Sequence, residues 1–203
     1  MALSRMRRAA AVAAVAALSL SACSTGATGE AGNGASSAAA ANDSFPVTIE
    51  HIYGETTIES APERVAAVAW SNAETALALG VVPVVMPAIT YGGNDQGTTP
   101  WIDEALEELD APIGSENAPA LYSDTDGIDF EEVAASDPDV ILAAYSGLTQ
   151  EDYDKLSKIA PVVAYPDAPW GTSWQETAEM TGEALGLSER AGELVAETEQ
   201  SIK

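Results

Sequence analysis

From residue 65 onwards, short and wholly apolar runs alternate with longer segments whose apolar side chains recur at helical spacing. Runs that are apolar on both faces are typical of strands buried inside a parallel sheet, whereas a surface helix carries one apolar stripe. The apolar runs lie at residues 65–70, 82–85, 140–145 and 162–165. This alternation predicts an α/β domain with a mainly parallel sheet flanked by helices.

Local signals place the ends of the helices between these strands. Ser71 and Glu74 have the spacing of a capping box, and Gly80 suits the residue that follows a helix. Asp129 can cap a helix that runs through Val133. Further helices are expected over residues 101–109 and 149–159, from Thr172 or Ser173 to Gly186, and from Ser188 onwards.

The first 22 residues have the three-part build of a secretory signal, with arginines, an apolar run and small residues. The apolar run has roughly a dozen residues, and a transmembrane helix needs about 20. Leu20-Ser21-Ala22-Cys23 resembles the lipobox of bacterial lipoproteins, and Cys23 is the only cysteine, so it has no disulfide partner. We expect export and a lipid anchor on Cys23 at the extracytoplasmic face of the cell membrane. An ordinary signal peptide followed by an unpaired cysteine is the alternative.

Three further segments follow Cys23. Residues 23–44 are rich in Gly, Ala, Ser, Thr and Asn and predict a flexible tether. The domain is expected over residues 45–187, opening with a hairpin whose strands lie on either side of Gly54. The last helix, 188–203, reaches the final residue without a Gly or Pro signal, which indicates a fragment whose partner domain is absent.

The chain is strongly acidic, with 8 basic and 32 acidic residues and a formal net charge of -24. Without residues 1–44, five basic residues remain against thirty acidic ones. Nucleic acids and anionic lipid surfaces are bound by clusters of Lys and Arg, so neither is expected as a partner of the domain. Most of the carboxylates are expected to keep an exported protein soluble.

Four stretches, taken in order, resemble one known family. They are residues 61–65, residues 70–80, residues 127–141 with Asp137-Pro138-Asp139 before the strand, and residues 145–163 followed by Ala168-Pro169-Trp170 and Trp174. On these stretches the chain is similar to the binding proteins of ABC importers for siderophores, haem and vitamin B12. The resemblance runs from about Pro46 to Lys203. It implies two α/β lobes joined by one long helix, of which this chain holds the N-terminal lobe and, at 188–203, the start of the helix.

The resemblance also implies a function. Such a receptor, acting as a monomer, binds a ferric siderophore outside the membrane and delivers it to the permease subunits of the importer. Glu131 matches the carboxylate at the top of the lobe that docks onto permease arginines, whereas Glu74 is assigned to the capping box. The alternatives are the same fold with haem or a corrinoid as cargo, or a surface lipoprotein with no role in transport.

Aromatic residues follow the predicted strands, at the edge of a parallel sheet where ligands bind. They are Trp70, Tyr91, Tyr145, Tyr165 and Trp170. A ferric siderophore already fills the coordination sphere of its iron, so its receptor needs flat side chains and hydrogen-bond donors, and neither metal ligands nor a cofactor. We therefore expect Trp70, Tyr91, Tyr145 and Trp170 to bind the ligand. Trp101 and Tyr153 lie on helical stripes and are assigned to packing.

Other kinds of site are disfavoured. His51 is the sole histidine and lies in the hairpin, so a multi-histidine site for free zinc is not expected. The sequence lacks a nucleophile elbow and a Gly-rich phosphate loop, which favours a binding protein over an enzyme. No Lys or Arg follows a predicted strand, so a neutral or cationic ferric hydroxamate suits the site better than an anionic tris-catecholate.

Overall fold

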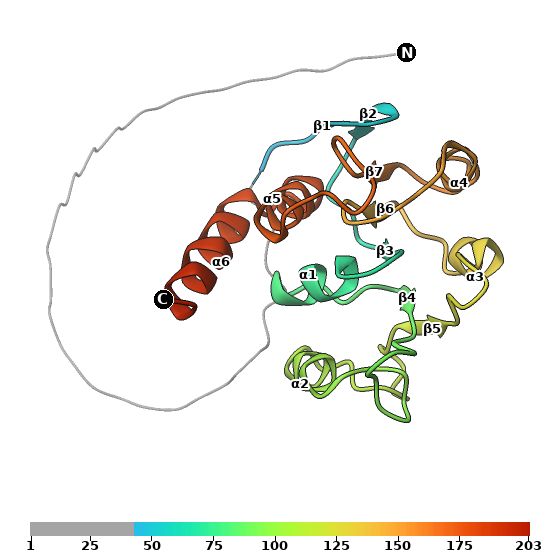
Figure 1. The fold of residues 1–203 in the computed structure, drawn as a ribbon, viewed down its shortest axis with the longest axis vertical. Helices are drawn as coiled ribbons and strands as arrows, with labels where there is room; N and C mark the ends of the chain where they lie inside the picture. Colours follow the sequence, from blue (N-terminus) through green and yellow to red (C-terminus); the bar gives the residue numbers. More distant parts are fainter. Residues whose placement is uncertain (1–42) are drawn as a thin grey trace, which may run out of the picture. The chain divides into compact units, whose positions relative to one another are not determined.

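The computed structural model describes residues 43–203, which form a two-stranded antiparallel hairpin and a five-stranded parallel sheet (Figure 1). The predicted signal segment, Cys23 and the tether up to residue 42 lie outside the described residues. The strands of the sheet have the spatial order β5-β4-β3-β6-β7. They are β3 (Val65–Ala67), β4 (Val85–Pro87), β5 (Ala120–Tyr122), β6 (Val140–Ala143) and β7 (Val162–Ala164).

Helices cover both faces of the sheet, which confirms the predicted α/β class (Figure 1). In the described part of the chain they are α1 (Asn72–Ala78), α2 (Pro100–Glu108), α3 (Phe130–Ala135), α4 (Gln150–Leu156), α5 (Trp174–Leu185) and α6 (Ser188–Ser201). Helices α1, α2 and α5 lie on one face and α3 and α4 on the other, while α6 packs on α5.

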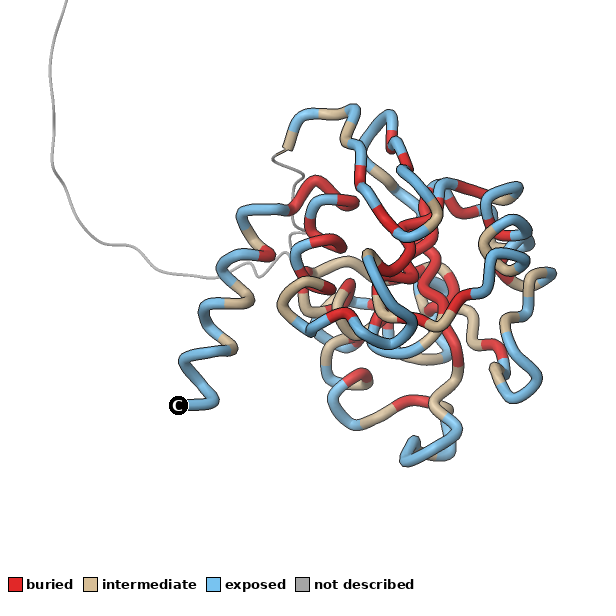
Figure 2. Tube along the Cα trace, turned by 45° about the horizontal axis from the view of Figure 1, so that its top comes forward, coloured by how far each residue is buried: buried red, intermediate tan, exposed pale blue. Residues whose placement is uncertain are grey.

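The central strands are buried on both faces because their side chains alternate between two apolar layers. Val140 and Leu142 of β6 pack with α1 and α5, whereas Ile141 and Ala143 pack with α3 and α4. Every residue of β3 and β6 is buried. Figure 2 shows buried residues concentrated in the strands at the centre, and α6 exposed along most of its length.

The hairpin of β1 (Val47–His51) and β2 (Gly54–Ile58) is confirmed and closes one end of the core. Its turn is Ile52-Tyr53, ahead of Gly54, whose φ of 118° suits a residue without a side chain. The Ile52 amide donates to the Tyr165 carbonyl at 3.0 Å. This bond ties the hairpin to the residue that follows β7.

Most of the predicted helix ends are confirmed. The Asp129 side chain accepts hydrogen bonds from the amides of Glu131 and Glu132 at the start of α3. Ser173 caps α5, and Gly186 ends it in the left-handed conformation with a φ of 71°. One prediction about the strands is wrong, because β4 begins at Val85 instead of residue 82. A further strand, β5, was not predicted.

The predicted capping box at Ser71 and Glu74 is wrong. Ser71 precedes α1 with a left-handed φ of 64°, and its side chain makes no capping hydrogen bond. An N-cap side chain reaches the helix amides from an extended backbone, which Ser71 does not have. The Ser71 carbonyl instead accepts a hydrogen bond from the Thr75 hydroxyl at 2.7 Å.

The connections place a crevice between the neighbouring strands β3 and β6. From β3 the chain leaves through α1 towards β4, and it returns from β5 to β6 through α3 on the opposite face. Ligands of open α/β sheets bind where adjacent strands lead away in this manner, beyond their carboxyl ends. The residues that follow β3 and β6 therefore surround the expected ligand-binding crevice.

Candidate functional site

Trp70 stands at the carboxyl end of β3 in an unusual backbone turn. Its neighbours Ala69 and Ser71 both have left-handed φ values, 59° and 64°. Left-handed conformations are costly for residues with a side chain and persist where the surrounding structure holds them. The turn leaves the Trp70 side chain 59% exposed, so this large apolar ring faces solvent beside the sheet.

Asn72 holds this turn against the end of β6. It is fully buried, and its Nδ2 donates to the carbonyls of Val68 at 2.7 Å, Trp70 at 3.0 Å and Tyr145 at 3.0 Å. Its Oδ1 accepts from the Tyr145 amide at 3.1 Å. One side chain therefore joins the backbones of two of the predicted ligand-binding residues.

Trp70, Tyr145 and Trp170 form one aromatic cluster. The Tyr145 and Trp170 rings are 5.5 Å apart between centroids and inclined at 70°, and those of Trp70 and Trp170 are 6.4 Å apart at 60°. The Trp170 amide donates to the Ser146 carbonyl at 2.8 Å. The Trp170 indole lies against Gly147, where a Cβ atom would be 2.3 Å from Nε1. Gly147 is therefore needed for this ring position.

A cleft of about 600 Å³ lies beyond the carboxyl ends of the strands, and the aromatic cluster forms one part of its wall. The volume lies within the range of small-molecule sites, about 300–1,000 Å³. The cleft is lined by Ala69, Trp70, Thr90, Tyr122, Asp124, Gly127, Ile128, Tyr145, Gly147, Leu148, Asp152 and Trp170. Three of the four predicted ligand-binding residues thus lie together.

Tyr122, Asp124 and Asp152 also belong to this lining and were not predicted from the sequence. Tyr122 and Asp124 belong to β5 and the turn after it, and β5 is too short to show an apolar run. Asp152 resembled one of many surface carboxylates. The aromatic character of Tyr122 at the end of an apolar triplet was the one available signal.

Tyr122 is a buried phenol on the cleft wall, 4% exposed. Its hydroxyl lies near the Ala69 backbone but reaches hydrogen-bond geometry with no group in residues 43–203. Burial, reinforced by the negative charge of Asp124, raises the pKa of Tyr122 above its usual value. The phenol is therefore neutral.

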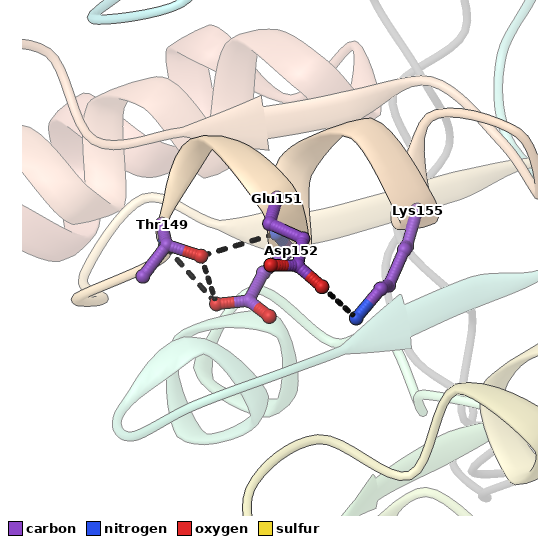
Figure 3. Close-up of polar contacts among 4 residues, drawn as sticks. All are labelled: Thr149, Glu151, Asp152 and Lys155. Atoms are coloured by element: carbon purple, nitrogen blue, oxygen red, sulfur yellow. Dashed lines mark hydrogen bonds and ion pairs between the residues drawn. The ribbon is translucent and has the colours of Figure 1, made fainter.

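Another part of the cleft wall is formed by Leu148 and Asp152, at the start of α4. Thr149 and Asp152 form a capping box, in which the Thr149 amide donates to Asp152 Oδ2 at 3.1 Å and the Asp152 amide donates to Thr149 Oγ1 at 3.2 Å (Figure 3). One turn further, Lys155 pairs with Glu151 at 2.8 Å. The hydrogen bonds of the capping box fix the position of the Asp152 carboxylate.

The hairpin supports this wall from behind. The hydroxyls of Tyr53 and Tyr165 both donate to the Leu148 carbonyl, and they lie 3.0 Å from each other. Burial is the main reason that the pKa of Tyr53 is raised. Tyr165, which follows β7, is 4% exposed. It supports the cleft wall through the Leu148 carbonyl but does not line the cleft.

The hairpin histidine is part of the packing. His51 Nδ1 accepts from the Tyr53 amide at 3.2 Å, and Nε2 lies 2.8 Å from the Thr56 hydroxyl, which itself donates to the Val162 carbonyl. Burial lowers the pKa of His51. The ring is therefore held neutral. Tyr153 stacks on Tyr53 with centroids 4.7 Å apart, in line with its assignment to packing.

The other predicted functional residues lie outside the cleft lining. Tyr91 is 89% exposed on the loop after β4 and borders a smaller groove next to Trp70 and Asp124. Glu131 is exposed in the first turn of α3. Cys23 is outside the described residues.

Residues 43–203 contain no group of three or more His, Cys, Asp or Glu side chains that could hold a metal ion. Among the helices described there, none combines the length and the apolar character needed to cross a membrane.

Comparison with known proteins identifies relatives of this arrangement. The family model for periplasmic binding proteins matches residues 65–203. Two crystal structures of PiaA, the iron uptake ABC transporter substrate-binding protein of Streptococcus pneumoniae, are 43% and 45% identical to the chain, with TM-scores of 0.68 and 0.70. The second of them is a complex with ferrichrome. The matches cover 76% and 75% of this chain and 49% of PiaA.

Two further crystal structures extend the comparison. A periplasmic solute binding protein from Mycobacterium smegmatis is 35% identical, with a TM-score of 0.65, over 75% of this chain and 50% of its own. Staphylococcus aureus SirA, complexed with staphyloferrin B, is 29% identical, with a TM-score of 0.55, over 74% of this chain and 46% of its own. The chain therefore spans about half the length of these solved relatives.

Proposed function

The chain belongs to the periplasmic binding protein family, and we propose that it forms the N-terminal lobe of a receptor that binds a ferric siderophore for an ABC importer. The observation that carries the proposal is the aromatic-walled cleft beyond the carboxyl ends of the sheet. The similarity to PiaA and SirA, whose structures include complexes with ferrichrome and staphyloferrin B, supports iron chelates as the cargo.

In this proposal the cleft binds its ligand without ligating the metal. Trp70, Tyr145 and Trp170 supply flat apolar area, with polar handles on the indole and phenol groups. Tyr122 offers a hydroxyl proton to an oxygen of the chelate. Tyr91 contacts the ligand from the rim of the cleft. No bond of the cargo is made or broken, so the receptor is not an enzyme.

The proposal includes the predicted domains and partners. Residues 1–22 direct export, Cys23 carries the lipid anchor, and residues 23–44 tether the lobe at 45–187 to the membrane surface. Residues 188–203 begin the helix that leads to a second lobe. Glu131, exposed at the start of α3, docks onto permease arginines, because a rim carboxylate mainly gives orientation and a fast encounter. The receptor acts as a monomer.

Fluorescence of the cleft tryptophans provides the experiment. Of the four tryptophans of this chain, Trp70 and Trp170 line the cleft, whereas Trp101 and Trp174 do not. The full-length protein with Trp101 and Trp174 replaced by Phe should lose emission when a ferric hydroxamate siderophore is added, because the bound chelate contacts Trp70 and Trp170. Haem and cobalamin are titrated in parallel, and quenching by either of them alone would favour that cargo.

A pair of glycine variants controls this experiment. Gly147→Ala should weaken binding by about tenfold, because its Cβ would displace the Trp170 indole. Gly192→Ala, in α6, meets no atom within 4 Å and should leave binding unchanged. Unchanged emission across a broad panel of ferric siderophores, haem and cobalamin would contradict the proposal.

A further inference from the structure

Resting on the proposed function, we propose that the cleft selects a ferric chelate that carries a positive group, such as a pendant ammonium. The Asp124 and Asp152 carboxylates and the aromatic faces of Trp70, Tyr145 and Trp170 receive that group.

The cleft lining is negatively charged. The lining contains two carboxylates, Asp124 and Asp152, and no Lys or Arg. The nearest lysine on α4, Lys155, is paired with Glu151 at 2.8 Å and lies 5.0 Å from the centroid of the Phe130 ring. Arg64 precedes β3 and donates to the carbonyls of Ser136 and Asp137. An anionic chelate would therefore meet two negative charges in this cleft, with no positive side chain in the lining to offset them.

The two carboxylates are available to a ligand. Asp124 is half-buried, and the ion pairs within residues 43–203 all lie elsewhere, on α4 and α6. The side-chain hydrogen bonds of Asp152 all go to Oδ2, from Thr149. In a half-enclosed cleft such charges are screened less by salt than the many carboxylates on the helix surfaces.

The aromatic cluster suits a cation as well. The Trp170 ring is inclined at 60° to that of Trp70 and at 70° to that of Tyr145, and all three residues line the cleft. The negative face of an aromatic ring attracts an ammonium group, and tryptophan does so most strongly. Aromatic rings combined with carboxylates are a recurrent way to hold a cationic group.

Tyr122 adds a buried polar group to the lining of the same cleft. The Tyr122 hydroxyl is buried and has no hydrogen-bond partner in the described residues, although it lines the cleft. An unpaired buried hydroxyl costs stability, and a ligand oxygen would satisfy it. In one molecule, the oxygens of a hydroxamate would suit the Tyr122 hydroxyl, and a positive group would suit the Asp124 and Asp152 carboxylates.

A matched pair of ligands tests the proposal. Ferrioxamine B is a linear ferric trihydroxamate with a free ammonium group, and its N-acetylated form has the same iron centre without that charge. In titrations of the full-length protein at 20 mM NaCl, we expect the ammonium form to bind about tenfold more tightly. At 500 mM NaCl the ratio should fall to about threefold, because salt screens the attraction.

Two aspartate variants complete the design. Asp124→Asn should lower the preference for the ammonium form to about threefold or less at 20 mM NaCl. Asp126→Asn removes the same charge two residues away, from an exposed side chain that does not line the cleft, and should keep the wild-type preference.

Equal affinities for the two ligands, or tighter binding of the acetylated form, would overturn this inference and leave the proposed function standing. The same holds if Asp124→Asn and Asp126→Asn behave alike. Binding of neither ligand, nor of any other ferric siderophore, would instead overturn the proposed function, so the two failures are distinguishable.

Discussion

Asn72 shows how much of the cleft depends on one buried side chain. It contributes nothing apolar to the core, yet it is fully buried and bonded to the backbone at Val68, Trp70 and Tyr145. A buried amide of this kind is stable because its donors and its acceptor are satisfied. Its position explains why the strained turn at Trp70 persists.

Removal of this amide should therefore affect both stability and binding. Asn72→Ala leaves carbonyls and the Tyr145 amide unpaired, and we expect a loss of about 2–4 kcal/mol in the free energy of unfolding, measured in urea. Binding should weaken as well, because the turn at Trp70 is released.

The matched control is Asn117→Ala, because Asn117 is exposed and makes one long hydrogen bond of 3.4 Å to the Asp110 carbonyl. Its cost should stay below about 0.5 kcal/mol. Equal stability of the two variants would show that Asn72 does not hold the turn.

At the scale of single residues, three aromatic positions of the cleft were predictable, whereas Tyr122 and the polar positions were not. Trp70, Tyr145 and Trp170 follow apolar runs, so their place at the edge of the sheet could be inferred from the sequence. Asn72 was assigned no role from the sequence, because its partner Tyr145 lies 73 residues away. Local patterns carry no information about such partners.

Among the elements, α4 connects helix capping to the shape of the cleft. Its first turn holds the capping box of Thr149 and Asp152, and the exposed pair of Glu151 and Lys155 links the first turn to the next (Figure 3). The two interactions lie on the same helix but differ in kind. The capping box satisfies backbone amides that have no partner within the helix, whereas the ion pair is screened by water.

The capping box should accordingly contribute more to stability. Thr149→Ala is expected to cost about 1 kcal/mol in the free energy of unfolding and to weaken ligand binding, because Asp152 loses its partner. Glu151→Gln should cost less than about 0.5 kcal/mol and leave binding unchanged. Urea unfolding of both variants measures the change in the free energy of unfolding, and ligand titration measures the change in affinity. A larger cost for Glu151→Gln would contradict the ranking.

The elements could be predicted where burial follows a period. The predicted helices over residues 101–109 and 149–159 correspond to α2 and α4, with ends shifted by one to three residues. By contrast, β5 consists of Ala120, Leu121 and Tyr122, and it is a strand because it pairs with β4. Three residues are too few for a periodic signal, so β5 depends on its neighbour.

Considered as a whole, the molecule carries a large uncompensated negative charge. The formal net charge is -24, and the ion pairs of the described residues involve only Lys155 and Arg190 as cations. Like charges spread over a folded domain repel one another and lower its stability. Helix α2 illustrates this with Glu104 and Glu108, four residues apart and both exposed.

Salt should therefore stabilise this protein. Raising NaCl from 20 to 500 mM is expected to raise Tm by about 5 °C, because the Debye length falls below the spacing of the surface charges. Differential scanning calorimetry measures the change. The double variant Glu104→Gln, Glu108→Gln should show a smaller rise, and a fall of the wild-type Tm with salt would contradict the expectation.

The sequence by itself determined the layers of this molecule. A strand that is buried on both faces needs a wholly apolar run, such as residues 140–143, and a helix that packs on a sheet needs an apolar stripe. Both patterns can be recognised within one short segment of the sequence. The tertiary structure alone decided which strand ends meet, since β3 pairs with β6 through residues as far apart as Val65 and Val140. That long-range pairing brings Trp70 to Tyr145. It also selects Asp124 and Asp152, out of all the acidic residues, to line the cleft.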